Sequence, residues 1–259
     1  MKPEELLQQL QHHPDFLKLT LAHADFLPFA CYQLENGTQI QIWDTGVIYC
    51  QPKQFGQQDI VLSSGVHGNE TAPVELCSEL LKDVLTGKLQ LTERVLFLFG
   101  NPPAINAGVR EIQDNLNRLF SGHHSKGAGL INAERRRAQA LENYVSRFYQ
   151  QGGEGRERAL YDLHTAIRGS RFEKFAVCPF LHGKPWKKAQ FQLLAACEVT
   201  TVLLMQTPAS TFSYYASNSH GADAFTVELG KVRPFGENDM RRFAKAEQTL
   251  RALVSGALP

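Results

Sequence analysis

His67 and Glu70 form the first pair in this sequence whose residue types and spacing could do metal chemistry. They stand three residues apart, shortly after the apolar run of residues 60–62. Where a strand gives way to a helix, two side chains at this spacing lie on one face of a helical turn and can bind one metal ion together. A surface histidine beside a glutamate at a helix start would show the same pattern, so the pair needs support from other residues.

His164 could supply the third ligand, because it ends another apolar run, residues 159–163. Two histidines and one glutamate with an open fourth position form a known pattern of catalytic zinc sites. Asp162 lies two residues earlier, on the same side of an extended segment. Its carboxylate could orient the ring of His164 from behind, without binding the metal itself. The alternative for Asp162 is an ordinary aspartate at a strand end.

A zinc hydrolase also needs a base that takes a proton from water. Glu228 stands near the end of the apolar run of residues 224–229 and is followed closely by Gly230, which is an unusual place for a packing residue. We therefore predict that Glu228 is the general base. An ion pair with Lys231 or Arg233 is the alternative.

Arginines follow two of the expected strands and indicate an anionic substrate. Arg110 and Arg118 could stabilise the negative charge that develops on an attacked carbonyl, or hold a carboxylate through paired hydrogen bonds. Arg168 and Arg171 form a cationic loop directly after His164. The sequence therefore predicts a small anionic substrate, with solvated surface arginines as the alternative for each position.

The composition limits the class of protein. The 27 basic and 26 acidic residues leave a formal net charge of +1, so no overall field indicates a nucleic-acid or membrane partner. The five cysteines are odd in number and form no C-x-x-C pair, which argues against a disulfide framework and favours reduced thiols. Without an apolar leader or a membrane-spanning run, we expect a cytoplasmic protein, whose oligomeric state the sequence leaves open.

The elements that must position these residues follow from the hydrophobic pattern. Strands alternating with helices predict an α/β fold with a mixed, largely parallel central sheet and helices on both faces. Asn36-Gly37 between alternating segments predicts an N-terminal β-hairpin. The expected strands are residues 31–34, 39–43, 59–63, 94–99, 159–163, 175–178, 199–205 and 224–229, and the expected helices are 4–11, 73–85, 132–149 and 239–254.

The candidate residues fall at the carboxyl ends of the expected strands. Open α/β sheets bind their ligands outside those ends, so the shared placement supports one common site. We expect residues 1–58 to form a helix and hairpin packed on the core, and residues 59–259 to form the catalytic domain, with one domain overall.

Five stretches together resemble the succinylglutamate desuccinylases, bacterial enzymes in the aspartoacylase branch of the zinc carboxypeptidase-like hydrolases. The stretches occur in the order of the family and are residues 65–75, 100–104, 117–120, 162–170 and 228–231. The resemblance implies a zinc carboxypeptidase-like fold and one Zn²⁺ per chain, held by His67, Glu70 and His164. It also implies that Glu228 acts as general base and then as general acid.

The same matching implies the roles of the substrate-binding residues. Arg110 would polarise the scissile carbonyl, and Asn117 and Arg118 would hold a substrate carboxylate. For the choice of succinyl over acetyl, Arg168 and Arg171 are the candidates.

The family reaction converts N2-succinyl-L-glutamate and water into succinate and L-glutamate, the last step of arginine catabolism by the succinyltransferase pathway. The alternatives are a related deacylase of another N-acyl amino acid, a carboxypeptidase, a zinc-binding module without catalysis, and an α/β protein without metal. Two departures stand out. Asn115 occupies a position where the family usually has aspartate, and the usual smaller C-terminal β-rich domain is expected to be absent, because the sequence stops at Pro259.

Overall fold

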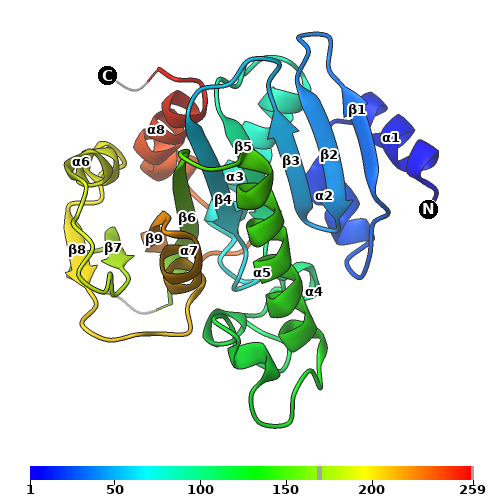
Figure 1. Cartoon of the computed structure of the whole chain (residues 1–259). Helices are drawn as coiled ribbons and strands as arrows, with labels where there is room; N and C mark the ends of the chain where they lie inside the picture. Colours follow the sequence, from blue (N-terminus) through cyan, green and yellow to red (C-terminus); the bar gives the residue numbers. More distant parts are fainter. Residues whose placement is uncertain (168–170, 258–259) are drawn as a thin grey trace.

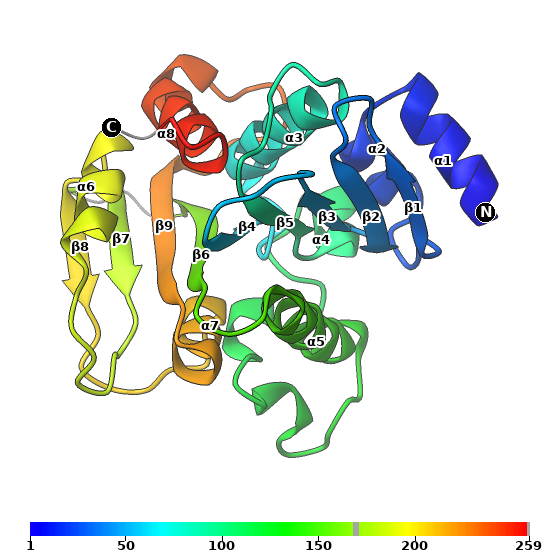
Figure 2. The same cartoon turned by 45° about the horizontal axis from the view of Figure 1, so that its top comes forward.

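The computed structural model describes residues 1–167 and 171–257. These residues form a nine-stranded sheet in the order β1-β2-β3-β5-β4-β6-β9-β7-β8, with helices packed against it (Figures 1 and 2). The strands are β1 Ala30–Gln33, β2 Gln39–Asp44, β3 Val47–Gln51, β4 Gln58–Ser64, β5 Arg94–Phe99, β6 Glu157–Ala166, β7 Phe175–Cys178, β8 Thr201–Leu204 and β9 Asp223–Lys231.

Parallel strands form the centre of the sheet. Strands β5, β4, β6 and β9 run parallel to one another, while β1, β2 and β3 join the β5 side through antiparallel pairs. On the other side, β7 runs antiparallel to β9 and parallel to β8. The predicted mixed sheet and the hairpin at Asn36-Gly37 are confirmed. The second reversal, between β9 and β7, has no counterpart in the sequence pattern.

Helices cover both faces of the sheet, as predicted. Helices α3 and α8 lie on one face, and α5 and α7 lie on the other (Figure 1). The side chains of β4 alternate accordingly, since Ile60 and Leu62 join the core under α3 whereas Val61 joins the core under α5. The helices are α1 Pro3–His12, α2 Phe16–Ala22, α3 Thr71–Leu85, α4 Pro102–Ala107, α5 Ala133–Gly152, α6 Lys188–Ala196, α7 Phe212–His220 and α8 Ala244–Val254.

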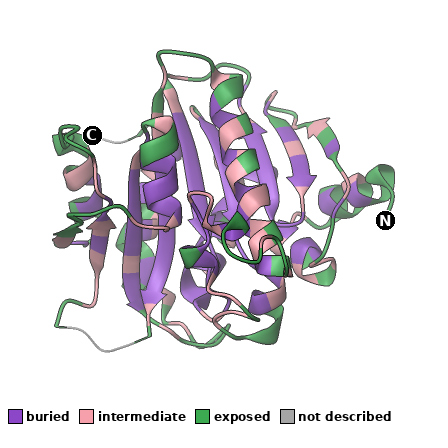
Figure 3. Ribbon diagram, turned by 60° about the horizontal axis from the view of Figure 1, so that its bottom comes forward, coloured by how far each residue is buried: buried purple, intermediate pink, exposed green. Residues whose placement is uncertain are grey.

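Short 3-10 turns complete the described chain: η1 Leu116–Arg118, η2 His123–Ser125 and η3 Met240–Phe243. The central strands are buried along most of their length, and exposure is concentrated on the outer helix faces and the loops (Figure 3). Residues 1–58 contribute β1, β2 and β3 to the same sheet as the rest, and a division of the chain at residue 58 stays a prediction. Within the described ranges, no helix is both long and apolar enough to cross a membrane.

Candidate metal centre and active site

Four of the candidate residues gather at one edge of the sheet, where the parallel strands β4, β6 and β9 end, namely His67, Glu70, His164 and Glu228. His164 in β6 stands directly opposite Glu228 in β9 in the register of the sheet. The loop that follows β4 carries His67 and Glu70. Because the carboxyl ends of parallel strands share one edge, three segments that are distant in the sequence meet there.

His67 and Glu70 lie in a loop, not on a helical turn as we expected, because α3 begins only at Thr71. Gly65 takes a left-handed φ of +66°, and a Cβ added to Gly68 would lie 2.1 Å from the backbone of α4. The two glycines therefore allow a tight turn and a close approach between loop and helix. A hydrogen bond of 3.3 Å from the N–H of Glu70 to the carbonyl of His67 closes the turn.

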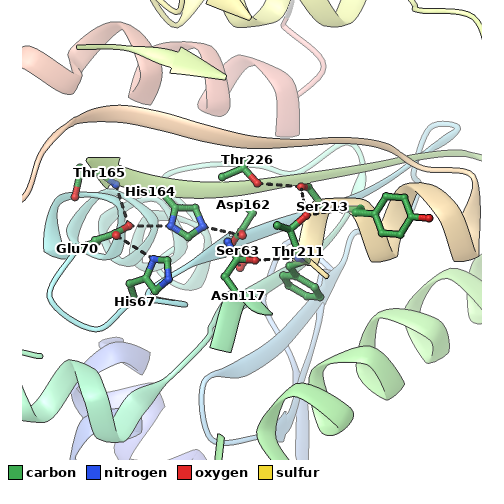
Figure 4. A network of polar contacts seen from close by, with 12 residues as sticks. Ser63, His67, Glu70, Asn117, Asp162, His164, Thr165, Thr211, Ser213 and Thr226 are labelled. Carbon is green, nitrogen blue, oxygen red and sulfur yellow. Dashed lines mark hydrogen bonds and ion pairs between the residues drawn. The ribbon is translucent and has the colours of Figure 1, made fainter. Parts of the chain in front are cut away.

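Three potential ligand atoms converge at this loop. One atom from each of His67, Glu70 and His164 lies within 4.8 Å of the others, and all three residues are buried (Figure 4). The Nδ1 atoms of His67 and His164 lie 2.9 and 2.8 Å from the two carboxylate oxygens of Glu70. The N–H of Thr165 donates to one of these oxygens at 3.1 Å. Two imidazole nitrogens and a carboxylate are a donor set that suits zinc, so these residues fit a metal ion.

The second ring nitrogen of each histidine has its own partner behind the site. Nε2 of His164 lies 2.7 Å from Asp162, whose other oxygen accepts a hydrogen bond of 2.8 Å from Ser63 Oγ. Nε2 of His67 lies 3.0 Å from Asn115 Oδ1. An acceptor that receives a hydrogen bond from the N–H of one ring nitrogen keeps the proton there and leaves the other nitrogen free for a metal. Sequence reasoning marked Asn115 only as a departure from the family pattern and missed this contact.

The buried charges of the group balance one another without a metal. Burial disfavours the ionised form of Glu70, but its contacts with His164 and His67 lower its pKa below the usual range. Burial likewise disfavours charged His164, but Asp162 and Glu70 raise the pKa of His164 well above its ordinary value. Because a histidine must lose its proton to bind a metal, an ion in this place would replace the proton of His164.

Glu228 lies beside this group with an unpaired oxygen. Its Oε2 is buried and has no hydrogen-bond partner among the described residues, so neither Lys231 nor Arg233 pairs with this oxygen. Burial raises the pKa of Glu228 to about 7, and the charge of His164 partly opposes the rise. A carboxyl group that titrates near neutral pH can both accept and return a proton.

Arg110 lies in the segment that joins α4 to η1, and Asn117 and Arg118 lie in η1 itself. Arg110 Nη1 donates to Glu70 at 2.7 Å. The buried Asn117 accepts a hydrogen bond of 3.0 Å from the N–H of Phe212 through its Oδ1, which leaves its NH2 group as the available donor. Arg118 is exposed and donates to the carbonyl of Asn117 at 2.8 Å.

Of the two arginines after His164, the structure describes only Arg171. Arg168 lies outside the described residues. Arg171 is exposed, and its guanidinium lies 5.7 Å from the ring of its neighbour Phe172. The described contact of Arg171 is therefore with its own loop.

Comparisons with known proteins identify the family that the chain resembles. Residues 56–254 match the family described as succinylglutamate desuccinylase/aspartoacylase catalytic domain. A protein of Shewanella amazonensis named succinylglutamate desuccinylase is 54% identical over 254 residues, which make up 96% of this chain and 73% of that protein.

Solved structures extend the comparison to the fold. The crystal structure of succinylglutamate desuccinylase from Chromobacterium violaceum has a TM-score of 0.88 and 42% identity, covering 95% of this chain and 75% of that one. A metallo-carboxypeptidase from Burkholderia cenocepacia has a TM-score of 0.58 and 15% identity, covering 94% of this chain and 67% of that one, and shares the fold. The carboxypeptidase-like fold is thereby confirmed.

Proposed function

Because the chain belongs to the family of succinylglutamate desuccinylase and aspartoacylase catalytic domains, we propose that it is a zinc-dependent amide hydrolase. Its substrate would be N2-succinyl-L-glutamate, cleaved by water to succinate and L-glutamate as the last step of arginine catabolism by the succinyltransferase pathway. The observation that carries this proposal is the convergence of His67, Glu70 and His164 at the strand ends beside Glu228.

Within this proposal, His67, Glu70 and His164 hold one Zn²⁺ per chain, and Asp162 orients His164. When bound, the ion supplies a Lewis acid and lowers the pKa of a water molecule to about 7. Asn115 holds the ring of His67 from behind, in the place that Asp162 takes behind His164.

Glu228 and Arg110 perform the proton transfer and the charge stabilisation. Glu228 takes a proton from the attacking water and returns it to the leaving amine nitrogen. Arg110 donates hydrogen bonds to the carbonyl oxygen as negative charge develops there. Because Arg110 pairs with Glu70 in this structure, its guanidinium has to turn away from that carboxylate to reach the carbonyl of a substrate.

The substrate has carboxylates at both ends, and the site has donors for them. The NH2 group of Asn117 and the exposed guanidinium of Arg118 bind one carboxylate. Arg168 and Arg171 follow β6 in the sequence and are our candidates for the succinyl end. We also place the protein in the cytoplasm, which its five unpaired cysteines support.

Metal content measured together with substrate preference tests the proposal. Protein purified without chelator should contain one zinc ion per chain and should hydrolyse succinylglutamate faster than N-acetylaspartate or a C-terminal peptide. Faster cleavage of N-acetylaspartate would indicate an aspartoacylase-like deacylase instead, and faster cleavage of the peptide would indicate a carboxypeptidase. Protein without zinc would contradict the proposed metal chemistry altogether.

Asn115→Asp should tighten zinc binding by about tenfold, because a carboxylate accepts a stronger hydrogen bond from His67 Nε2 and raises the basicity of the ring. Aspartate keeps the oxygen that also accepts from the N–H of Asn117 at 3.0 Å, so the turn at η1 is preserved. Competition with a chromogenic chelator measures the dissociation constant of zinc.

The matched control for this change is Asn36→Asp, which adds the same charge in the distant hairpin turn. There the side-chain oxygen accepts from the N–H of Thr38, a contact that aspartate keeps. Equal zinc affinity in wild type, Asn115→Asp and the control would show that the contact behind His67 does not influence the metal.

A further inference from the structure

Glu134 is a buried carboxylate for which the proposed reaction has no use. It lies in the first turn of α5 and is 3% exposed. Among the described residues it forms no ion pair with an arginine or lysine, and its contacts are all with neutral donors. A charge removed from water without a cation needs several hydrogen bonds to offset its lost hydration.

Four donors surround the carboxylate. One oxygen accepts from the N–H of Ile112 at 2.7 Å and from Asn101 Nδ2 at 2.9 Å. The other oxygen accepts from the N–H groups of Gln113 at 2.8 Å and Asp114 at 2.6 Å. Successive backbone N–H groups that turn toward one point form an anion-binding concavity, and here the bound anion belongs to the protein itself.

The three N–H groups lie in the middle of the segment that carries the substrate residues. Arg110 stands two residues before them, and its carbonyl accepts a hydrogen bond of 3.1 Å from Gly68 in the metal loop. Asn115 follows directly and contacts His67. Asn117 comes two residues later. The carboxylate of Glu134 therefore holds the centre of a segment whose two ends, at Arg110 and Asn115, contact the loop of His67.

Little else fixes this centre. The side chain of Ile112 is 51% exposed and that of Gln113 is exposed as well, so neither anchors the backbone in the core. Among the described residues, the other side-chain tether of residues 112–114 is the partly exposed contact of Asp114 Oδ2 with Arg135 Nε at 2.8 Å and Asn132 Nδ2 at 3.0 Å. The side chains of Arg135 and Asp114 are 19% and 34% exposed, so water screens this ion pair more than it screens the contacts of the buried Glu134 carboxylate.

We propose that Glu134 is a positioning residue of the active site. By accepting hydrogen bonds from three consecutive backbone N–H groups, it fixes the segment 110–118 and therefore the positions of Arg110, Asn117 and Arg118. The catalytic part of this inference rests on the proposed function, whereas the backbone contacts do not. A displacement of a substrate-binding group by about 1 Å is enough to slow an enzyme about 100-fold.

Glu134→Gln tests the inference, because it keeps the size of the side chain but turns an NH2 group toward N–H donors. We expect faster amide hydrogen exchange at residues 112–114, measured by mass spectrometry of overlapping peptides. We also expect kcat/KM for succinylglutamate to fall about 10- to 100-fold. KM should rise because Asn117 and Arg118 bind a carboxylate that does not react, and kcat should fall because Arg110 is displaced as well. Zinc content should stay at the wild-type level.

Glu142→Gln is the matched control on the same helix. Glu142 accepts from the N–H of Gly122 at 3.3 Å and contacts His124, so this variant should speed exchange near residue 122 and leave residues 112–114 protected. If Glu134→Gln does not fold, Glu134→Asp retains the charge with a shorter reach and should give faster exchange at residues 112–114 and a higher KM than the wild type.

The outcomes separate this inference from the proposed function. Wild-type exchange at residues 112–114 in the variant, or faster exchange with an unchanged KM, would overturn the positioning role. A wild-type protein that does not cleave succinylglutamate, while exchange in Glu134→Gln still increases, would reject the proposed reaction and retain the backbone contacts.

Discussion

His164→Ala should yield a protein without bound zinc and lower kcat/KM for succinylglutamate by at least about 10,000-fold. Only His67 and Glu70 would remain of the three converging ligands. With the metal, the site loses both water activation and carbonyl stabilisation, and each of these effects is worth roughly 100-fold or more. Metal analysis and steady-state kinetics measure the two losses in one preparation.

The same change should destabilise the metal-free protein. His164 stands between the buried carboxylates of Asp162 and Glu70, at 2.7 and 2.8 Å, and its removal leaves both without their shared partner. Removal of one member of a buried ion pair typically costs about 3–5 kcal/mol, and part of this cost should appear as a lower Tm. His12→Ala, an exposed histidine in α1, is the control. A variant that keeps its zinc and wild-type Tm would contradict the geometry described above.

Glu228→Gln should also lose activity but, unlike His164→Ala, should retain its zinc, with kcat lowered about 100- to 10,000-fold. Glutamine fills the same space but cannot accept the proton of water. Glu157→Gln is the matched control, because Glu157 is exposed and begins β6, at the opposite end of that strand from His164. Wild-type kcat in Glu228→Gln would remove Glu228 from the mechanism.

The pH dependence of the wild-type enzyme should report the same group. Burial raises the pKa of Glu228 to about 7 without metal, and a bound cation favours the carboxylate and lowers it from there. As the base must be ionised, kcat/KM should rise with pH through a limb at or below about pH 7. A limb that persists unchanged in the residual activity of Glu228→Gln would assign it to another group.

The raised pKa also predicts a stability effect of definite sign. A carboxyl group whose folded pKa lies above its unfolded value lowers stability in full above the folded pKa, and this cost declines as the pH falls from the folded toward the unfolded pKa. Metal-free Glu228→Gln should therefore melt at a higher temperature than the metal-free wild type at pH 8. The difference should shrink toward pH 5, as scanning calorimetry can measure.

The elements near the site could be predicted because their residues are buried on both sides. Central parallel strands are continuous apolar runs, which is why β4, β5, β6 and β9 are visible in the sequence. Helix α7 was missed for the opposite reason. It is rich in serine, and its Ser213 is buried, with a hydrogen bond of 2.9 Å between its hydroxyl and that of Thr226 in β9. Such a helix depends on tertiary contacts and shows no apolar repeat.

The supporting contacts of the site could not be predicted in the same way. His67 and Asn115 are 48 residues apart, and their contact depends on the path of an irregular segment. Glu134 stands directly before three arginines and resembles part of a solvated helix face. Only its position in the first turn of α5, after the capping Asn132, distinguishes it from a surface residue. Arg168 lies outside the described residues, so its role stays a prediction.

The alignment of His164 with Glu228 across β6 and β9 has a consequence for the evolution of the chain. Successive side chains of a strand point to opposite faces, so a slip of one residue would carry Glu228 to the wrong side of the sheet. Substitutions in β9 can be accommodated gradually, whereas a single inserted or deleted residue before Glu228 cannot. Related sequences should therefore vary in composition along β9 while keeping its length unchanged.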